Sequence, residues 1–265
     1  MPDASSVLLP APRRGRLSIE AGTLIVRALR LTLRDTDSLI TALALPVLLM
    51  LMFVYLFGGA IHTPTSYVDY VVPGVLLVCV GFGAGTTAVS VSKDLNGGMI
   101  DRLRSMDVRG VTLINGHVVA SVLRNLLSTA IVLVVALAIG FRPHGDPAGW
   151  LAALAVLLVY VVGLSWFAAA IGIFARSAEA AQGIAFLVSF LAYPSSAFVP
   201  VHTMPSALQG FAANQPVSQV ADAMRALLGG THAGGSAWAA AAWSVGIIAG
   251  SIALGAVLFR RHRVH

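Results

Sequence analysis

An all-α membrane protein with about six transmembrane helices is the fold class that the amino-acid sequence predicts. Hydrophobic residues make up 57% of the 265 residues and charged residues only 11%, whereas soluble domains carry about 25% charged residues. Six stretches nearly free of charge approach or exceed the roughly 20 residues that a helix needs to cross the hydrocarbon core. Their runs of Leu, Val and Ala lack the alternation of barrel strands, and backbone groups in lipid must be paired internally.

The six spans form one domain over residues 38–259. We expect them at residues 38–58, 70–92, 117–140, 150–174, 180–199 and 236–259. The third span is the least apolar, because extending its charge-free core takes in Arg124. An arginine near a helix end can extend to the interface, which is the interpretation we prefer. Alternatively, Arg124 faces a polar path through the bundle.

Basic residues orient the bundle, because they are concentrated in cytoplasmic segments. Fifteen lie on the side of the two termini, including the tail at residues 260–265. Only Arg142 and Arg225 lie on the other side. The start of the chain also lacks the apolar core of a signal peptide. Both termini are therefore predicted to be cytoplasmic.

The N-terminal segment, residues 1–37, contains a candidate amphipathic helix over residues 17–35. Arg27, Arg30 and Arg34 share one stripe, and apolar residues cover the neighbouring face. Such a helix is typical of an interfacial anchor on anionic lipid. It could also grip a cytoplasmic partner.

The longest charged stretch between spans is the cytoplasmic segment at residues 93–108. Met99, Ile100, Leu103 and Met106 can share one helix face, with charged residues around them. We expect a helix that offers a docking surface, the alternative being a solvated loop.

The outer segment after the fifth span is long, almost uncharged and rich in proline. The apolar spacing predicts one short helix around Leu208 and a second that begins at Pro216 and ends at Gly229. Asp222 and Arg225 can pair at i, i+3 on the second helix. Such an apolar outer segment is expected to dip into the membrane or to cap a cavity.

Several kinds of site are missing from the sequence. The only lysine is Lys93, so no phosphate-binding loop with a lysine is present. The seven histidines have no HxxxH spacing and Cys79 is the only cysteine, so no metal site is expected. Gly81–Gly85 and Gly246–Gly250 are interpreted as helix-packing faces. The charges lie between spans rather than on one readout face, which argues against nucleic-acid binding.

Two other functions can be weighed from the residues. An ion-coupled secondary exporter would commonly use acidic residues within its spans, and these spans lack them. An intramembrane serine protease is suggested by Gly163-Leu164-Ser165-Trp166, but it would need a histidine base within another helix. Ser165 is better interpreted as a packing residue that bonds its own helix.

Four elements of the outer segment follow in a characteristic order. They are Ser195 to Pro200, Met204-Pro205, Asn214-Gln215-Pro216 and Ala223-Met224-Arg225. The cytoplasmic segment adds Asp94, Gly98 and Asp101-Arg102-Leu103-Arg104. In this pattern the chain resembles the ABC type-2 permease family, in particular its daunorubicin/doxorubicin-resistance (DrrB-like) branch.

The resemblance implies a permease without catalytic residues that acts in the cell membrane as a homodimer. Each copy would dock an ATP-binding-cassette ATPase subunit, which would hold ATP and Mg²⁺. Substrates of this branch are amphipathic drugs, antibiotics or lipids. The ATPase-coupling residues would be Asp94, Gly98, Asp101, Arg102, Leu103 and Arg104 in a coupling helix, and the outer lid, residues 199–230, would include Pro200, Pro205, Asn214, Pro216 and Arg225.

Hydroxyl side chains within the spans are candidates for a substrate path. They could hydrogen-bond a substrate, or they could equally bond their own helices. With Arg124, the candidates are Thr86, Thr87, Ser90, Ser128 and Thr129.

Overall fold

The computed structural model describes residues 36–63, 65–97 and 110–261, and within these ranges the chain is helical without a strand. The all-α prediction is confirmed. The elements are α2 (Thr36–Met52), a π-helical turn η1 (Phe53–Phe57), α3 (Tyr67–Asn96), α5 (Gly110–Ala138), α6 (Pro147–Phe174), α7 (Ala178–Phe190), a 3₁₀ turn η2 (Val201–Thr203), α8 (Ser206–Asn214), α9 (Pro216–Leu228) and α10 (Gly234–Arg261). The helix predicted at residues 17–35 lies outside the described residues.

The membrane-spanning helices follow the predicted order. Four are long and apolar enough to cross a bilayer: Tyr67–Asn96, Ile114–Ala138, Pro147–Phe174 and Gly234–Leu258. Two shorter apolar helices, Leu43–Phe57 and Ala178–Phe190, lie at the first and fifth predicted spans. The chain is therefore a multi-pass membrane protein.

The third membrane helix is longer than expected. The helix α5 begins at Gly110 instead of residue 117, so Arg124 lies in its middle, about 21 Å from either end. The interpretation that the Arg124 side chain extends to the interface from near a helix end is therefore wrong. Its guanidinium instead donates to the hydroxyl of Thr86 on α3 at 2.5 Å.

The fifth span ends earlier than expected, because α7 stops at Phe190 and residues 191–199 form turns. Pro194 has no N–H for a helical hydrogen bond and disfavours helix at the residue before it. Irregular backbone at membrane depth is tolerated where protein covers it. Ala192, Ser195 and Phe198 of this connecting segment are accordingly buried.

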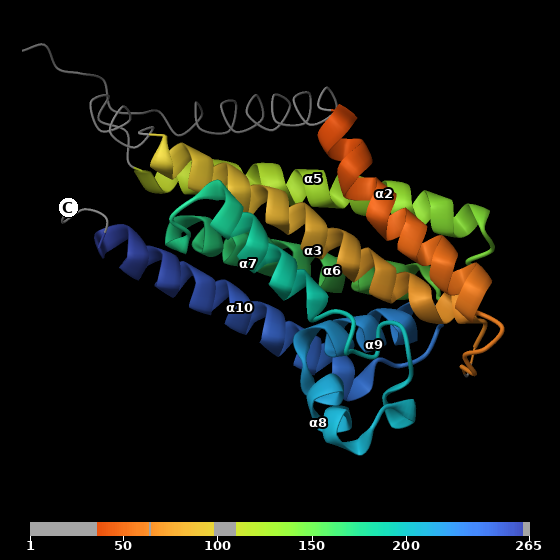
Figure 1. The fold of residues 1–265 in the computed structure, drawn as a ribbon. Coiled ribbons are helices and arrows are strands. Elements are labelled where there is room, and N and C mark those ends of the chain that lie inside the picture. The colour runs from red at the N-terminus through yellow and green to blue at the C-terminus, as the bar shows by residue number, and fades with distance from the viewer. Residues whose placement is uncertain (1–35, 64, 98–109, 262–265) are drawn as a thin grey trace, which may run out of the picture.

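The helix α3 runs through the middle of the bundle and contacts α2, α5, α6, α7 and α9 (Figure 1). Close approach depends on glycine at two contacts. A Cβ at Gly172 of α6 would lie 2.6 Å from the carbonyl oxygen of Ala88, and one at Gly83 would lie 1.9 Å from Oδ1 of Asn125. Gly81 and Gly85 face α7, as their spacing predicted, whereas Gly246 and Gly250 meet no other described atoms.

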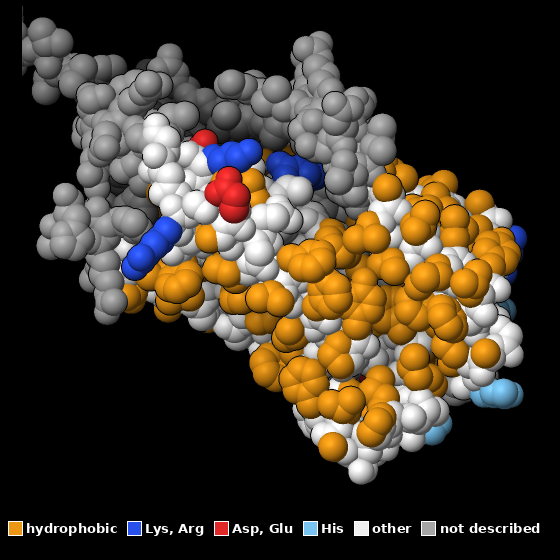
Figure 2. Space-filling model, viewed as in Figure 1, with side chains coloured by type: hydrophobic (Ala, Val, Ile, Leu, Met, Phe, Trp, Pro, Cys, Tyr) orange, Lys and Arg blue, Asp and Glu red, His pale blue; other side chains and the backbone are white. Residues whose placement is uncertain are grey.

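The two ends of the bundle differ. The end of α3, the start of α5 and the end of α10 lie together at one end, and α8 and α9 lie at the other (Figure 1). Figure 2 shows a face on which charged side chains gather toward the first of these ends, while apolar side chains cover much of the rest. Leu151, Leu154 and Trp238 are among the exposed apolar side chains, as expected of a lipid-facing surface.

Candidate functional site

The lid, residues 199–230, forms the two short helices that the sequence predicted. Pro216 occupies the first turn of α9, and Gly229 caps its end. Gly230 follows with a φ of +74°, a backbone conformation that glycine adopts without strain. The helix α8 is more exposed, with Leu208 and Phe211 at 46% and 50% exposure.

Arg225 makes four contacts, of which three join the lid to α3 and the connecting segment. Its guanidinium donates to the carbonyl oxygens of Tyr70 at 3.1 Å and Ser196 at 3.0 Å, and to Oδ1 of Asp222 at 2.5 Å. It also lies 3.8 Å from the centre of the Tyr70 ring, within range of a cation–π interaction. The predicted pair with Asp222 is confirmed, and the contacts with α3 and the connecting segment are additional.

The connecting segment is bound between α3 and the lid. The hydroxyls of Tyr67 and Tyr70 donate to the carbonyl oxygens of Phe198 and Ser196, at 3.0 and 2.8 Å. From the lid side, the hydroxyl of Ser218 accepts from the Ser196 amide at 2.9 Å. The lid, the connecting segment and the start of α3 therefore form one hydrogen-bonded unit.

The other predicted lid residues take different positions. Pro200 is buried, and Pro216 lines a cavity beneath the lid. Pro205 and Asn214 are exposed at the two ends of α8, where the Asn214 amide bonds its own helix at Gly210. Only part of the predicted set thus contacts the bundle.

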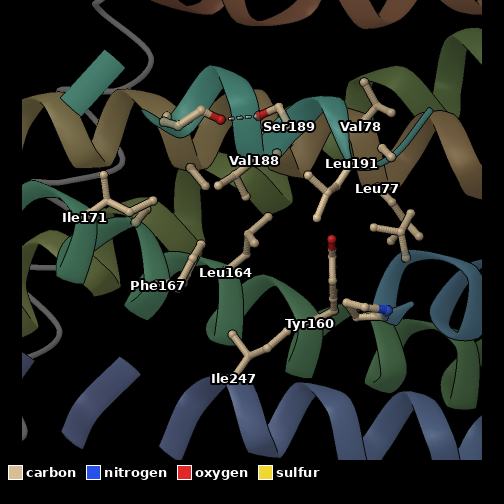
Figure 3. Close-up of a pocket in the computed structure, with 18 of the residues that line it drawn as sticks. Leu77, Val78, Tyr160, Leu164, Phe167, Ile171, Val188, Ser189, Leu191 and Ile247 are labelled. Carbon is tan, nitrogen blue, oxygen red and sulfur yellow. Dashed lines mark hydrogen bonds between the residues drawn. The ribbon is translucent and has the colours of Figure 1, made fainter. Parts of the chain in front are cut away.

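A cavity of about 210 Å³ lies under the lid, between α3, α6, α7 and α10 (Figure 3). Its wall is almost wholly apolar, with Leu77, Leu164 and Phe167 among the lining residues. Gln215, Pro216 and Val217 of the lid region complete the wall. None of the six predicted path residues lines this cavity; Thr129 lines a smaller one of about 120 Å³ between α3, α5, α6 and α9.

Two of the predicted path residues, Arg124 and Thr86, form a polar contact between α5 and α3. Thr86, Ser90 and Thr129 donate to carbonyl oxygens of their own helices. The hydroxyls of Thr87 and Ser128 are buried and have no hydrogen-bond partner among the described residues.

At the opposite end of the bundle, Asp94 of α3 pairs with a residue that sequence reasoning missed. Nε2 of His117 lies 2.8 Å from Oδ2 of Asp94. The two are 23 residues apart and no local pattern links them. The other predicted coupling residues, Gly98, Asp101, Arg102, Leu103 and Arg104, lie outside the described residues.

The family model for the ABC-2 type transporter matches residues 20–228, which include the connection between α3 and α5 and the lid as far as the end of α9. This chain belongs to the ABC-2 type transporter family. It is 31% identical over 264 residues to the daunorubicin resistance ABC transporter permease protein DrrB1 of Streptomyces coeruleorubidus, covering 97% of this chain and 90% of that protein. It is also 23% identical over 234 residues to a probable doxorubicin resistance ABC transporter permease protein, DrrC, of Mycobacterium tuberculosis, covering 88% and 85%.

Membership identifies the chain as a transmembrane transport protein of the permease type. The resemblance to the drug-resistance branch is confirmed by these relatives, which are named as permeases and not as enzymes.

The structure also bears on other chemistry in this ABC-2 permease. Within the described ranges, no three His, Cys, Asp or Glu side chains group as a metal site would require. Ser165 is fully buried, and its hydroxyl has no hydrogen-bond partner there, so the bond to its own helix that we expected is absent. No described histidine activates it as a protease would require.

Proposed function

We propose that this chain is the permease subunit of an ATP-binding-cassette exporter that moves an amphipathic drug, antibiotic or lipid out of the cell. A separate ATPase subunit binds ATP and Mg²⁺ and supplies the energy. Family membership supports the permease role, and the names of both relatives support the substrate class. The absence of a phosphate-binding loop from the sequence supports a separate ATPase.

One observation carries the mechanism: a single helix, α3, connects the cytoplasmic segment to the lid. Its 30 residues extend about 45 Å. At one end, Lys93 and Asp94 begin the proposed coupling segment, and at the other Tyr70 contacts Arg225. Movement of the coupling segment by the ATPase would therefore displace the surface on which the lid rests.

The orientation follows from the charges. Fourteen of the 17 basic residues belong to segments on the side that holds the termini, and Arg124 lies in the middle of α5. The positive-inside rule assigns the side of the termini to the cytoplasm. The end of α10 lies beside the ends of α3 and α5 that flank the coupling segment (Figure 1). Both termini and the ATPase dock therefore share one side, and the lid faces outward. The resemblance further implies two copies per transporter.

The coupling assignment is tested in proteoliposomes that contain the permease and its ATPase. The double variant Arg102→Ala/Leu103→Ala should lose ATP-dependent export and should remain folded and inserted. The control is Arg176→Ala, which removes an exposed arginine from the segment between α6 and α7. Undiminished export by the double variant would refute the coupling segment.

A second measurement tests the energy source. The purified permease alone should neither bind nor hydrolyse ATP. Export that follows a proton gradient without the ATPase would contradict the proposal and favour an ion-coupled exporter.

A further inference from the structure

Three polar side chains line the largely apolar cavity beneath the lid: Tyr160, Ser189 and Gln215. The Ser189 hydroxyl donates to the Ala185 carbonyl oxygen of its own helix at 2.9 Å. The side chains of Tyr160 on α6 and Gln215 at the start of α9 are each only 5% exposed. No described residue hydrogen-bonds the Tyr160 hydroxyl, and Oε1 of Gln215 is buried with no hydrogen-bond partner in the described part of the chain. A buried polar group without a partner is unfavourable and rare, so Oε1 of Gln215 calls for a partner, and the Tyr160 hydroxyl points into the cavity, where it is available to a ligand.

The two groups are complementary in hydrogen bonding. Nε2 of Gln215 donates to the carbonyl oxygen of Pro194 at 2.5 Å, which leaves Oε1 as an acceptor. The Tyr160 hydroxyl can donate and accept. Figure 3 shows this hydroxyl pointing into the space toward Leu77 and Leu191. A ligand hydroxyl could accept from Tyr160 and donate to Gln215.

The cavity is polar at one end only. Tyr160 is the lining residue of α6 nearest to the lid, and Gln215 belongs to the lid itself. Phe167, Ala168 and Ile171 line the other end, about 10 to 16 Å further along α6. A molecule in this cavity would therefore place its polar group under the lid and its apolar part toward the cytoplasmic end.

We infer that the cavity binds the apolar, ring-sized part of the transported substrate, with a hydroxyl of the substrate between Tyr160 and Gln215. Its volume of about 210 Å³ suits this group, because an engineered apolar cavity of about 150 Å³ binds benzene. The site lies within a single copy of the chain. The assignment of the ligand as substrate rests on the proposed function, whereas binding itself does not.

A matched pair of probes tests the binding. The full chain in nanodiscs is titrated with 4-propylphenol and with propylbenzene by ligand-observed NMR, with empty nanodiscs to subtract partition into lipid. Tyr160→Phe should weaken 4-propylphenol binding roughly fivefold, because one net hydrogen bond is lost, and should leave propylbenzene unchanged. Its thermal stability should be unaffected, because the hydroxyl bonds no described residue. Equal binding of the two probes by the unaltered chain would overturn the inference.

A second pair of variants tests the location. Ala168→Leu fills the inner end of the cavity and should reduce binding of both probes at least tenfold. Ala153→Leu is the control, because Ala153 lies on the same helix, is equally buried at 2% and lines the smaller cavity instead. Full binding by Ala168→Leu, or equal loss in both variants, would overturn the inference.

Transport separates this inference from the proposed function. With the ATPase present, Ala168→Leu should lower export at least fivefold, and Ala153→Leu should not. Normal export by a variant that no longer binds the probes would refute the assignment of the ligand as substrate. An unaltered chain that binds the probes but never exports with its ATPase would refute the proposed function and that assignment, and leave the binding site standing.

Discussion

Removing the Arg225 side chain should loosen the lid and the connecting segment. Two charge-assisted hydrogen bonds to backbone carbonyls contribute about 1.5–3 kcal/mol each, and the contact with the Tyr70 ring adds about 1 kcal/mol. The pair with Asp222 adds less than about 1 kcal/mol, because the Asp222 side chain is 40% exposed. These contributions are not additive, and the Ser196 carbonyl keeps the Tyr70 hydroxyl as a donor. We therefore expect Arg225→Ala to lower the free energy of local opening by about 3 kcal/mol.

Hydrogen exchange measures this loss directly, because the amides of the connecting segment exchange when the lid opens. A loss of about 3 kcal/mol corresponds to roughly a hundredfold faster exchange in a peptide over residues 191–199. Arg225→Lys should give an intermediate rate, because lysine keeps the charge but lacks the planar fork of donors.

Arg142→Ala is the control for this experiment. Arg142 lies between α5 and α6, and among the described residues its side chain donates to the nearby carbonyl oxygens of Leu137 and Phe141 alone. Exchange of residues 191–199 should be unchanged in this variant. A less than threefold increase in Arg225→Ala, or the same increase in both variants, would refute Arg225 as the residue that holds the lid.

Two further predictions concern the bundle. A double-mutant cycle between Asp94→Asn and His117→Gln should give a coupling energy below about 1 kcal/mol, since the two side chains are 34% and 20% exposed. Each single variant should nevertheless lower the export per ATP hydrolysed at least threefold. Unchanged export would exclude a role of this pair in coupling. Gly172→Ala should destabilise the protein by about 2 kcal/mol in thermal unfolding, because the added Cβ would clash with the Ala88 carbonyl oxygen. The control, Gly246→Ala, adds a Cβ in open space and should be neutral or stabilising. Equal stability changes in the two variants would contradict this packing.

Much of the fold could be predicted because its signals are local. Charge-free runs gave the membrane helices, and Pro216 and Gly229 marked the ends of α9. The errors arose where a helix boundary depends on its surroundings. The start of α5 at Gly110 precedes its apolar core, and the end of α7 at Phe190 is followed by irregular backbone that neighbouring elements bury.

The candidate site was less predictable. The pair of Asp222 and Arg225 could be expected because i, i+3 residues are neighbours on any helix. The threonines and serines were identified by type, yet none of them lines the larger cavity, and Thr86 instead contacts Arg124 of a neighbouring helix. Tyr160 and Gln215, which supply the polar groups of that cavity, belong to no local motif.

The sequence by itself determined the membrane character, the order of the spans and the two lid helices. Each of these depends on the composition of a segment or on the spacing of near neighbours. Only the tertiary structure decided that Arg225 rests on Tyr70, 155 residues away, that His117 meets Asp94, and that five elements enclose a cavity with a single polar end. Such contacts depend on how closely whole helices approach one another, and close packing at residues such as Gly83 and Gly172 sets that distance.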